Sequence, residues 1–246
     1  MDITQAFDER LQEINEYLTL LEALERQTQD GPPKIGGKAI TAQQKRILCS
    51  SVYLQLYNLV EATATWCMKA VAEAAAENGR WRLGDLSVDL RREWVRHTAR
   101  THIEMNRDKR LTKAVEFCDR LIQTVAVSDW EIEKGGGGNW DDRAFEKMTG
   151  RIGLELNVSA TAKKGVKQRL RDDKGALGLV KSFRNELAHG NISFSDRGEG
   201  VTVADLKDIK KRVEQYLKEV IRVFSDYIDG YKFLIPERRP VKGAPA

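Results

Sequence analysis

Residues 203–228 have the sequence VADLKDIKKRVEQYLKEVIRVFSDYI, in which apolar side chains recur every three or four positions. That interval matches the 3.6-residue turn of an α-helix, so the apolar side chains line one face. The members of this stripe are Val203, Leu206, Ile209, Val213, Leu217, Val220, Phe224 and Ile228. Most of the stability of such a helix comes from packing its apolar face against other elements. The segment therefore predicts a long helix that packs onto a helical core.

Helical patterns also dominate the chain before this segment. An N-terminal stripe ends before the Gly- and Pro-rich residues 29–37, and it consists of Ile3, Phe7, Leu11, Ile14, Leu18 and Leu21. Residues 42–78 form a second predicted helix, whose central part, 48–71, is apolar on most of its circumference. That distribution is typical of a helix in the middle of a bundle. Further helices are expected over residues 87–105, 111–125, 141–150 and 176–190.

The remaining segments give no sign of a sheet. Residues 157–164 are expected to be irregular, and residues 191–203 to form a loop or a small hairpin. No internal repeat is present. The fold class is therefore predicted as all-α, a helical bundle with long flanking helices. We expect a single domain over residues 1–236 and a flexible tail over residues 237–246.

The composition indicates a folded protein with a basic C-terminal part. Of the 246 residues, 41% are hydrophobic and 32% are charged, which is enough apolar material for a sizeable core and too much for a disordered chain. The formal net charge is +4, and residues 151–246 carry 20 Lys and Arg against 13 Asp and Glu. This basic part is compatible with a phosphate-rich partner.

Several classes of protein are excluded by what the sequence lacks. No apolar run approaches the roughly 20 residues needed to cross a bilayer, and the first residues do not resemble a secretory signal. The three cysteines, Cys49, Cys67 and Cys118, form no CxxC pair, so neither a disulfide framework nor a zinc site is indicated. We expect two of them in the core, a cytoplasmic location, and neither a metal, a cofactor nor a membrane partner.

A candidate catalytic group lies at the end of the helix predicted over residues 176–190. Arg184, Asn185 and His189 lie off its apolar stripe, and Gly190 stands where helices commonly end. The partial negative charge at a helix C-terminus favours the imidazolium form of a histidine. Such a histidine can move a proton to or from a ribose hydroxyl, while an arginine holds the phosphate and its developing charge. The group therefore points to phosphodiester chemistry.

The spacing of this Arg–His pair is not selective by itself. His97 follows Arg92 by the same interval, and His102 follows Arg96 by one residue more. The context favours the pair at the end of the 176–190 helix, because an asparagine directly follows its arginine and a helix-ending glycine follows its histidine. His97 and His102 are expected to be solvated or structural residues on a basic helix.

The arrangement Arg184-x4-His189 resembles the R-x4–6-H motif of the HEPN superfamily, whose helical domains include many prokaryotic ribonucleases. Two longer blocks, RNELAHGNISFS (184–195) and LQLYNLVEA (54–62), are similar to the MAE-type branch of HEPN nucleases, which is known from toxin–antitoxin and phage-defence settings. The long amphipathic helix after the motif fits this branch as well. The resemblance extends over about residues 5–235.

The resemblance implies a metal-independent endoribonuclease, a toxin or phage-defence effector, that cleaves RNA through the 2′-hydroxyl. In this role His189 is the general acid and base, Arg184 binds the phosphate, and Asn185 orients the histidine or the phosphate. The resemblance also implies a homodimer with a composite active site, and it leaves room for an antitoxin or regulatory partner. Some HEPN domains are instead non-catalytic modules that bind RNA or protein, and Asn185 can be an ordinary solvated residue. Both alternatives stay open.

A polar group interrupts the apolar segment 48–71. It consists of Tyr57, Asn58 and Glu61. A glutamate buried there without a partner is costly, so Glu61 either faces solvent or pairs with a cation. The resemblance suggests that this face lies near the motif helix, which makes Arg184 a candidate for that cation. The group either supports the site or forms an ordinary buried hydrogen bond.

Two sets of basic residues are candidates for binding an RNA backbone. One set recurs every four residues along a predicted helix and consists of Arg92, Arg96 and Arg100. The other precedes the motif helix and consists of Lys163, Lys164 and Lys167. Each set is either a phosphate-binding surface or a solvated face beside acidic neighbours. No aromatic signature of base stacking accompanies them.

The glycine run Gly135–Gly138 is expected to be a flexible linker. A phosphate-binding glycine loop would end in Gly-Lys-Ser/Thr or stand between a strand and a helix, and neither context is present.

Overall fold

The computed structural model describes residues 2–28, 31–100, 106–122, 126–128 and 130–240 of the chain. Its helices and strands are α1 (Ile3–Gln27), β1 (Lys34–Ile35), β2 (Lys38–Ala39), α2 (Ala42–Ala76), α3 (Val88–Arg100), α4 (Arg107–Ile122), α5 (Asp142–Arg151), α6 (Ala160–Lys167), α7 (Ala176–Ala188), α8 (Phe194–Arg197) and α9 (Val203–Asp229). The only sheet within the described residues is the antiparallel pair of two-residue strands. The fold class is therefore all-α, as the sequence predicts.

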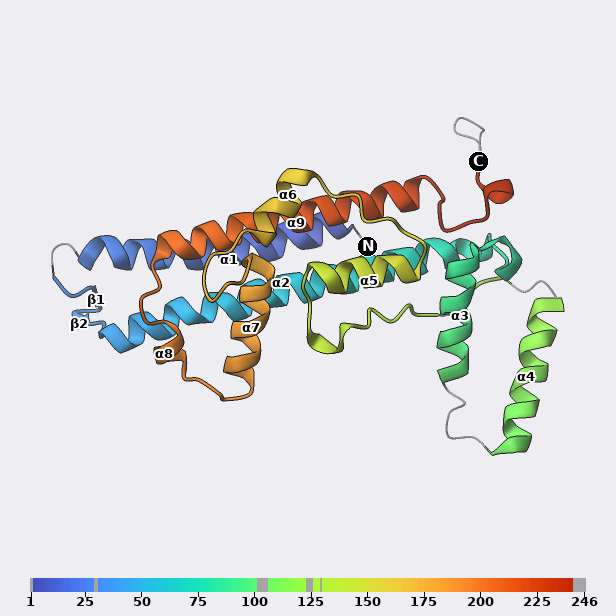
Figure 1. The fold of residues 1–246 in the computed structure, drawn as a ribbon, viewed down its shortest axis with the longest axis horizontal. Coiled ribbons are helices and arrows are strands. Elements are labelled where there is room, and N and C mark those ends of the chain that lie inside the picture. The colour runs from blue at the N-terminus through green and yellow to red at the C-terminus, as the bar shows by residue number, and fades with distance from the viewer. Residues whose placement is uncertain (1, 29–30, 101–105, 123–125, 129, 241–246) are drawn as a thin grey trace.

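Three long helices, α1, α2 and α9, lie side by side and form the body of the bundle (Figure 1). The stripe predicted for residues 203–228 faces the core, and all of its residues except the partly buried Ile228 are buried. The stripe predicted for α1 is buried in the same way. α2 is buried on most of its circumference, which confirms its predicted place in the middle of the bundle.

The two longest helices begin at side chains that satisfy free backbone N–H groups. At the start of α2, Thr41 Oγ1 accepts the N–H of Gln44 at 3.1 Å, and the Gln44 side chain accepts the N–H of Thr41 at 2.8 Å. Thr202 and Asp205 form the same reciprocal pair at the start of α9. Such capping boxes define a helix start from local sequence alone.

The motif helix α7 crosses α2 and packs its apolar stripe onto it (Figure 1). The Phe183 ring meets the Tyr53 ring of α2 edge-on, with centroids 4.8 Å apart. His189 is the C-cap residue, and Gly190 follows with a φ of 69°, a left-handed conformation that is common directly after a helix. The helix predicted over residues 176–190 is thereby confirmed.

Two segments predicted to be irregular contain short helices instead. Residues 157–164 include the start of α6, where Ser159 Oγ accepts the N–H of Ala162 at 3.2 Å. Residues 191–203 include α8, which Ser193 caps, and no hairpin. Both predictions are wrong because helices of one or two turns are too short to establish an apolar period. A capping serine is the local signal that remains.

The helix predicted over residues 111–125 has apolar residues that do not enter the bundle core. α3 and α4 extend away from the three long helices (Figure 1), and Leu111 and Val115 of α4 are 66% and 51% exposed. α4 instead contacts α3 through Phe117, whose ring centroid lies 5.3 Å from that of Trp94. Periodicity predicts that a helix has an apolar face, but it does not predict what covers that face.

Some predicted boundaries fall partly outside the described residues. The third helix is predicted to reach residue 105 and the fourth to reach residue 125, but residues 101–105, which include His102, and residues 123–125 are not described. The same holds for residues 241–246 of the predicted tail. The first part of that tail forms a 3-10 turn, Pro236–Arg238, and Arg238 Nε lies 3.0 Å from Asp85 Oδ1.

Two of the three cysteines lie in the core, as predicted. Cys49 and Cys67 are buried, whereas Cys118 is exposed on α4. Among the helices of the described residues, none combines the length and the apolar character that a membrane crossing requires.

Gly175 lets the start of α7 pack closely against the end of α6. A Cβ at this position would lie 2.0 Å from the backbone oxygen of Val166. We expect Gly175→Ala to lower the free energy of unfolding by about 1–3 kcal/mol, because rigid backbone cannot yield to the added methyl group. Denaturant unfolding measures the change.

Gly165→Ala is the matched control, because a Cβ at this site inside α6 meets nothing within 4 Å. Alanine is favoured over glycine within a helix by roughly 0.5–1 kcal/mol, so this variant should be slightly more stable than the wild type. Equal stability of the two variants would contradict the close packing of α6 and α7.

Candidate active site

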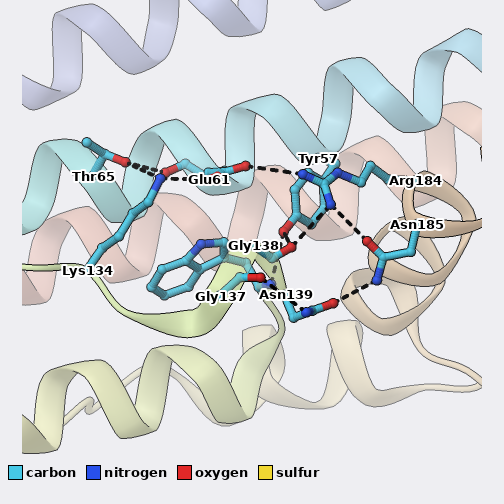
Figure 2. Close-up of polar contacts among 10 residues, drawn as sticks. Tyr57, Glu61, Thr65, Lys134, Gly137, Gly138, Asn139, Arg184 and Asn185 are labelled. Carbon is cyan, nitrogen blue, oxygen red and sulfur yellow. Dashed lines mark hydrogen bonds and ion pairs between the residues drawn. The ribbon is translucent and has the colours of Figure 1, made fainter. Parts of the chain in front are cut away.

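Arg184 lies half-buried on α7 and points toward α2 (Figure 2). Its Nη1 donates to Asn185 Oδ1 at 2.9 Å and, more weakly, to the Gly138 carbonyl oxygen at 3.4 Å. Its Nη2 lies 3.8 Å from Glu61 Oε2. The guanidinium is therefore surrounded by acceptors from α2, from α7 itself and from the segment that precedes α5.

Tyr57 of α2 provides the surface on which Arg184 rests. The guanidinium carbon lies 4.4 Å from the centre of the Tyr57 ring, within the range of a cation–π contact. The Tyr57 hydroxyl donates to the Gly138 carbonyl oxygen and accepts the N–H of Trp140 at 3.2 Å. Burial raises the pKa of the Tyr57 phenol, against the lowering effects of the Trp140 N–H and of Arg184. The hydroxyl consequently remains protonated, and able to donate, at neutral pH.

Glu61 lies one helical turn after Tyr57 and faces two cations (Figure 2). One is Arg184, which forms the ion pair suggested by the resemblance. The other is Lys134, whose Nζ lies 2.8 Å from Glu61 Oε1 and 3.1 Å from Thr65 Oγ1. The closer of the two contacts belongs to Lys134, a residue that the sequence does not single out.

Asn185 joins the motif helix to the glycine-rich segment. Its Nδ2 donates to Asn139 Oδ1 at 2.7 Å, and Asn139 Nδ2 in turn lies 3.4 Å from the Gly137 carbonyl oxygen. Figure 2 shows this chain of contacts closing the network beside Arg184. Asn185 thereby contacts both Arg184 and the segment, which is more than a solvated helix residue does.

The glycine run is predicted to be a flexible linker, and this prediction is wrong. Residues 134–140 run along α2, and Gly136–Gly138 form a 3-10 turn whose last carbonyl faces Tyr57 and Arg184. Gly137 and Gly138 have φ values of 54° and 74°, which glycine adopts without strain. Asp141 then caps α5 through the N–H of Ala144 and pairs with Lys181 of α7. The segment is fixed at both ends and forms one wall of the site.

His189 lies at the open end of the same helix. It is exposed, and its backbone N–H donates to the Asn185 carbonyl oxygen at 3.0 Å. Its imidazole has no hydrogen-bond or ion-pair partner within the described part of the chain. Asn58 is likewise exposed and takes no part in the network. The structure thus brings Tyr57, Glu61 and Asn185 to Arg184, but it brings neither Asn58 nor the imidazole.

The basic residues proposed for RNA binding are largely engaged with acidic neighbours. Arg92 pairs with Asp89 at 3.0 Å and Arg96 with Glu93; the side chain of Arg100 is outside the described residues.

In the second set, Lys163 and Lys167 each lie 3.0 Å from a carboxylate of α5, namely Glu146 and Asp142. Lys164 is exposed and has no ion-pair partner among the residues described. Both sets therefore fit the solvated face beside acidic neighbours better than a dedicated phosphate-binding surface.

Neither alternative histidine forms a comparable network within the described residues. His97 is half-buried on α3, with Arg92 paired elsewhere, and His102 lies outside those residues. In the same part of the chain, no group of three or more His, Cys, Asp or Glu side chains is placed to hold a metal ion.

The family model described as MAE_28990-like HEPN matches residues 1–233. The chain belongs to this family. The match extends from α1 through α9 and so includes both the motif helix and the network around Arg184. HEPN domains are often ribonucleases or nucleotide-binding domains. Comparisons with curated proteins and with solved structures gave no match.

The Tyr57 hydroxyl is the anchor that holds the glycine segment in this HEPN domain. Tyr57→Phe removes the acceptor of the Trp140 N–H and the donor to Gly138, and each unsatisfied buried group costs about 1–3 kcal/mol. We expect lower stability and faster amide hydrogen exchange across residues 134–140. Hydrogen exchange read by mass spectrometry measures the second effect.

Tyr17→Phe is the matched control, because Tyr17 also loses one hydrogen bond, to the Leu48 carbonyl oxygen, at a distant point of the bundle. It should leave exchange over residues 134–140 at the wild-type rate. Unchanged exchange in Tyr57→Phe would show that the segment does not depend on this anchor.

Proposed function

We propose that this HEPN domain is a metal-independent endoribonuclease. The observation that carries the proposal is the half-buried Arg184, fixed by α2, α7 and the glycine segment. His189 is exposed at the end of the same helix, and its imidazole has no partner among the residues that the structure describes. A fixed guanidinium suits a phosphate, which it can bind through two parallel N–H groups. Histidine is the side chain that most often transfers protons in general acid–base catalysis.

In the proposed reaction the ribose 2′-oxygen attacks the adjacent phosphorus and the bond from phosphorus to the 5′-oxygen breaks. One proton leaves the 2′-hydroxyl and one is delivered to the 5′-oxygen, so the products carry a 2′,3′-cyclic phosphate and a 5′-hydroxyl. His189 transfers these protons and Arg184 stabilises the charge that develops on the phosphate. Asn185 positions Arg184 for that task through its hydrogen bond to the guanidinium.

The reaction needs a base and an acid at the same time, and each chain offers one histidine with this context. We therefore propose a homodimer in which two copies of residues 182–190 face one cleft. We also place the activity in a toxin or phage-defence setting in the cytoplasm, with RNA as substrate and an antitoxin or regulatory partner that restrains it. This setting rests on the resemblance to MAE-type HEPN nucleases.

Cleavage of RNA by the purified protein tests the reaction directly. We expect His189→Ala to lower the rate by roughly 10²–10⁴, because proton transfer by a positioned side chain contributes about that factor. His97→Ala is the matched control and should stay within a few fold of the wild type. If His97→Ala were the inactive variant, the assignment of the motif would be wrong.

The same assay separates this chemistry from that of metal-dependent nucleases. Cleavage should persist in excess EDTA, and a strand with a 2′-O-methyl group at the scissile ribose should not be cleaved. Cleavage of that blocked strand, or a requirement for Mg²⁺ in the chemical step, would contradict attack by the 2′-hydroxyl. Binding of RNA without cleavage by the wild type would favour the non-catalytic module.

The composite site is tested by the state of assembly. We expect sedimentation velocity at micromolar concentration to give a dimer, with the two-fold axis close to residues 182–190. A cross-link engineered at that point should form between chains. A strict monomer that still cleaves RNA would contradict the composite site.

A further inference from the structure

Glu61 is one negative charge placed between two positive ones. Lys134 Nζ lies 2.8 Å from one carboxylate oxygen, whereas Arg184 Nη2 lies 3.8 Å from the other. Figure 2 shows the carboxylate between the two cations, in a line from Thr65 to Arg184. The shorter distance shows that the carboxylate is hydrogen-bonded to the lysine and only loosely paired with the arginine.

Lys134, Glu61 and Arg184 form a set of three charges on this line. Asp141 at the end of the glycine segment pairs with Lys181 of α7. The set of Lys134, Glu61 and Arg184 therefore keeps one net positive charge, which remains available to an anion beside Arg184. Without Lys134 the remaining Glu61 and Arg184 would be a neutral pair.

We propose that Lys134 is a positioning residue that keeps Arg184 available to a substrate phosphate by holding the Glu61 carboxylate away from it. This inference rests on the proposed function, since it assigns a role within the same site. A carboxylate released from Lys134 would close onto the guanidinium, because the two groups match in a bidentate hydrogen-bonded pair. A phosphate would then have to displace Glu61 before it could bind Arg184.

Lys134 is itself held in place from two sides. Its Nζ also donates to Thr65 Oγ1 at 3.1 Å, and its backbone carbonyl oxygen accepts from Arg151 Nη1 at 3.4 Å. Arg151 of α5 is in turn ion-paired with the buried Glu93 of α3. The lysine that competes for Glu61 is therefore tied to the bundle through both its side chain and its backbone.

The reactivity of Arg184 toward phenylglyoxal tests this role without any RNA. Arg184 is 28% exposed, so the reagent can reach it, and peptide mass spectrometry follows its modification. Lys134→Met removes the charge and keeps the aliphatic stem; we expect modification of Arg184 to slow by about threefold or more, as a closer ion pair forms. Glu61→Gln, alone or combined with Lys134→Met, should restore or exceed the wild-type rate.

Two further variants separate charge from structure. Lys134→Arg keeps the charge opposite Glu61, so Arg184 should be modified at a rate within about twofold of the wild-type rate. Lys69→Met removes a lysine of α2 that is 59% exposed and pairs with Glu73 at 3.6 Å; it should leave Arg184 unaffected. A wild-type rate in Lys134→Met, or a slow rate that Glu61→Gln does not restore, would overturn the proposal.

Affinity for a 2′-O-methyl RNA, which cannot be cleaved by the proposed route, gives the second readout. Lys134→Met should weaken binding by roughly two- to fivefold, the range of one partly exposed ion pair. In cleavage assays the same variant should raise KM with little change in kcat. If the double variant binds as weakly as Lys134→Met, the lysine contacts RNA itself and the proposal is wrong.

The two proposals can fail separately. In one case the wild-type protein cleaves no RNA, but the variants show the expected order of Arg184 modification rates. That result would contradict the nuclease proposal and support the control of Arg184 by Lys134. The opposite pattern would be a wild-type protein that cleaves RNA, with Arg184 modification rates that do not depend on Glu61. It would contradict the role of Lys134 alone.

Discussion

The Tyr57 side chain joins three distant parts of the chain around one arginine. Its ring face contacts the guanidinium of Arg184, and its hydroxyl bonds both Gly138 and Trp140. Because the ring is buried in the central helix, its polar end must find partners within the protein. The glycine segment supplies them and is thereby fixed beside Arg184. The surroundings of the arginine are consequently set by the core of the bundle as much as by the motif helix.

The long helices could be predicted from the sequence because each must bury one face, and burial dictates a period that the residues reveal. The stripe from Val203 to Phe224 is buried as predicted. The short helices α6 and α8 could not be predicted in this way, since two turns contain too few apolar positions. The exposed stripe of α4 shows the other limit: Leu111 and Val115 have the right period but no surface of the bundle to pack on.

The residues of the site likewise fall into those that the sequence predicts and those that it does not. Arg184 and Asn185 could be found from the sequence because they lie off the apolar stripe of the motif helix. Glu61 could be found because it interrupts an apolar segment, and its pairing with Arg184 is suggested by the resemblance. Lys134 and Asn139 could not, since nothing in a glycine run indicates which surface it will follow. Their positions depend on tertiary contacts with Glu61 and Asn185, residues about 50 to 70 positions away. A glycine run flanked by a lysine, an asparagine and a tryptophan is the only local signal.

Helix geometry places the two residues of the Arg184–His189 pair on different faces of α7. His189 follows Arg184 by five positions. Over that interval a regular α-helix rises about 7.5 Å and, once the whole turn is subtracted, rotates by about 140°. Arg184 faces α2, so a histidine rotated this far faces away from the bundle, in agreement with its exposure. In the proposed homodimer, an imidazole that faces away from its own bundle is available to a cleft shared with the second chain, as the resemblance to HEPN nucleases implies.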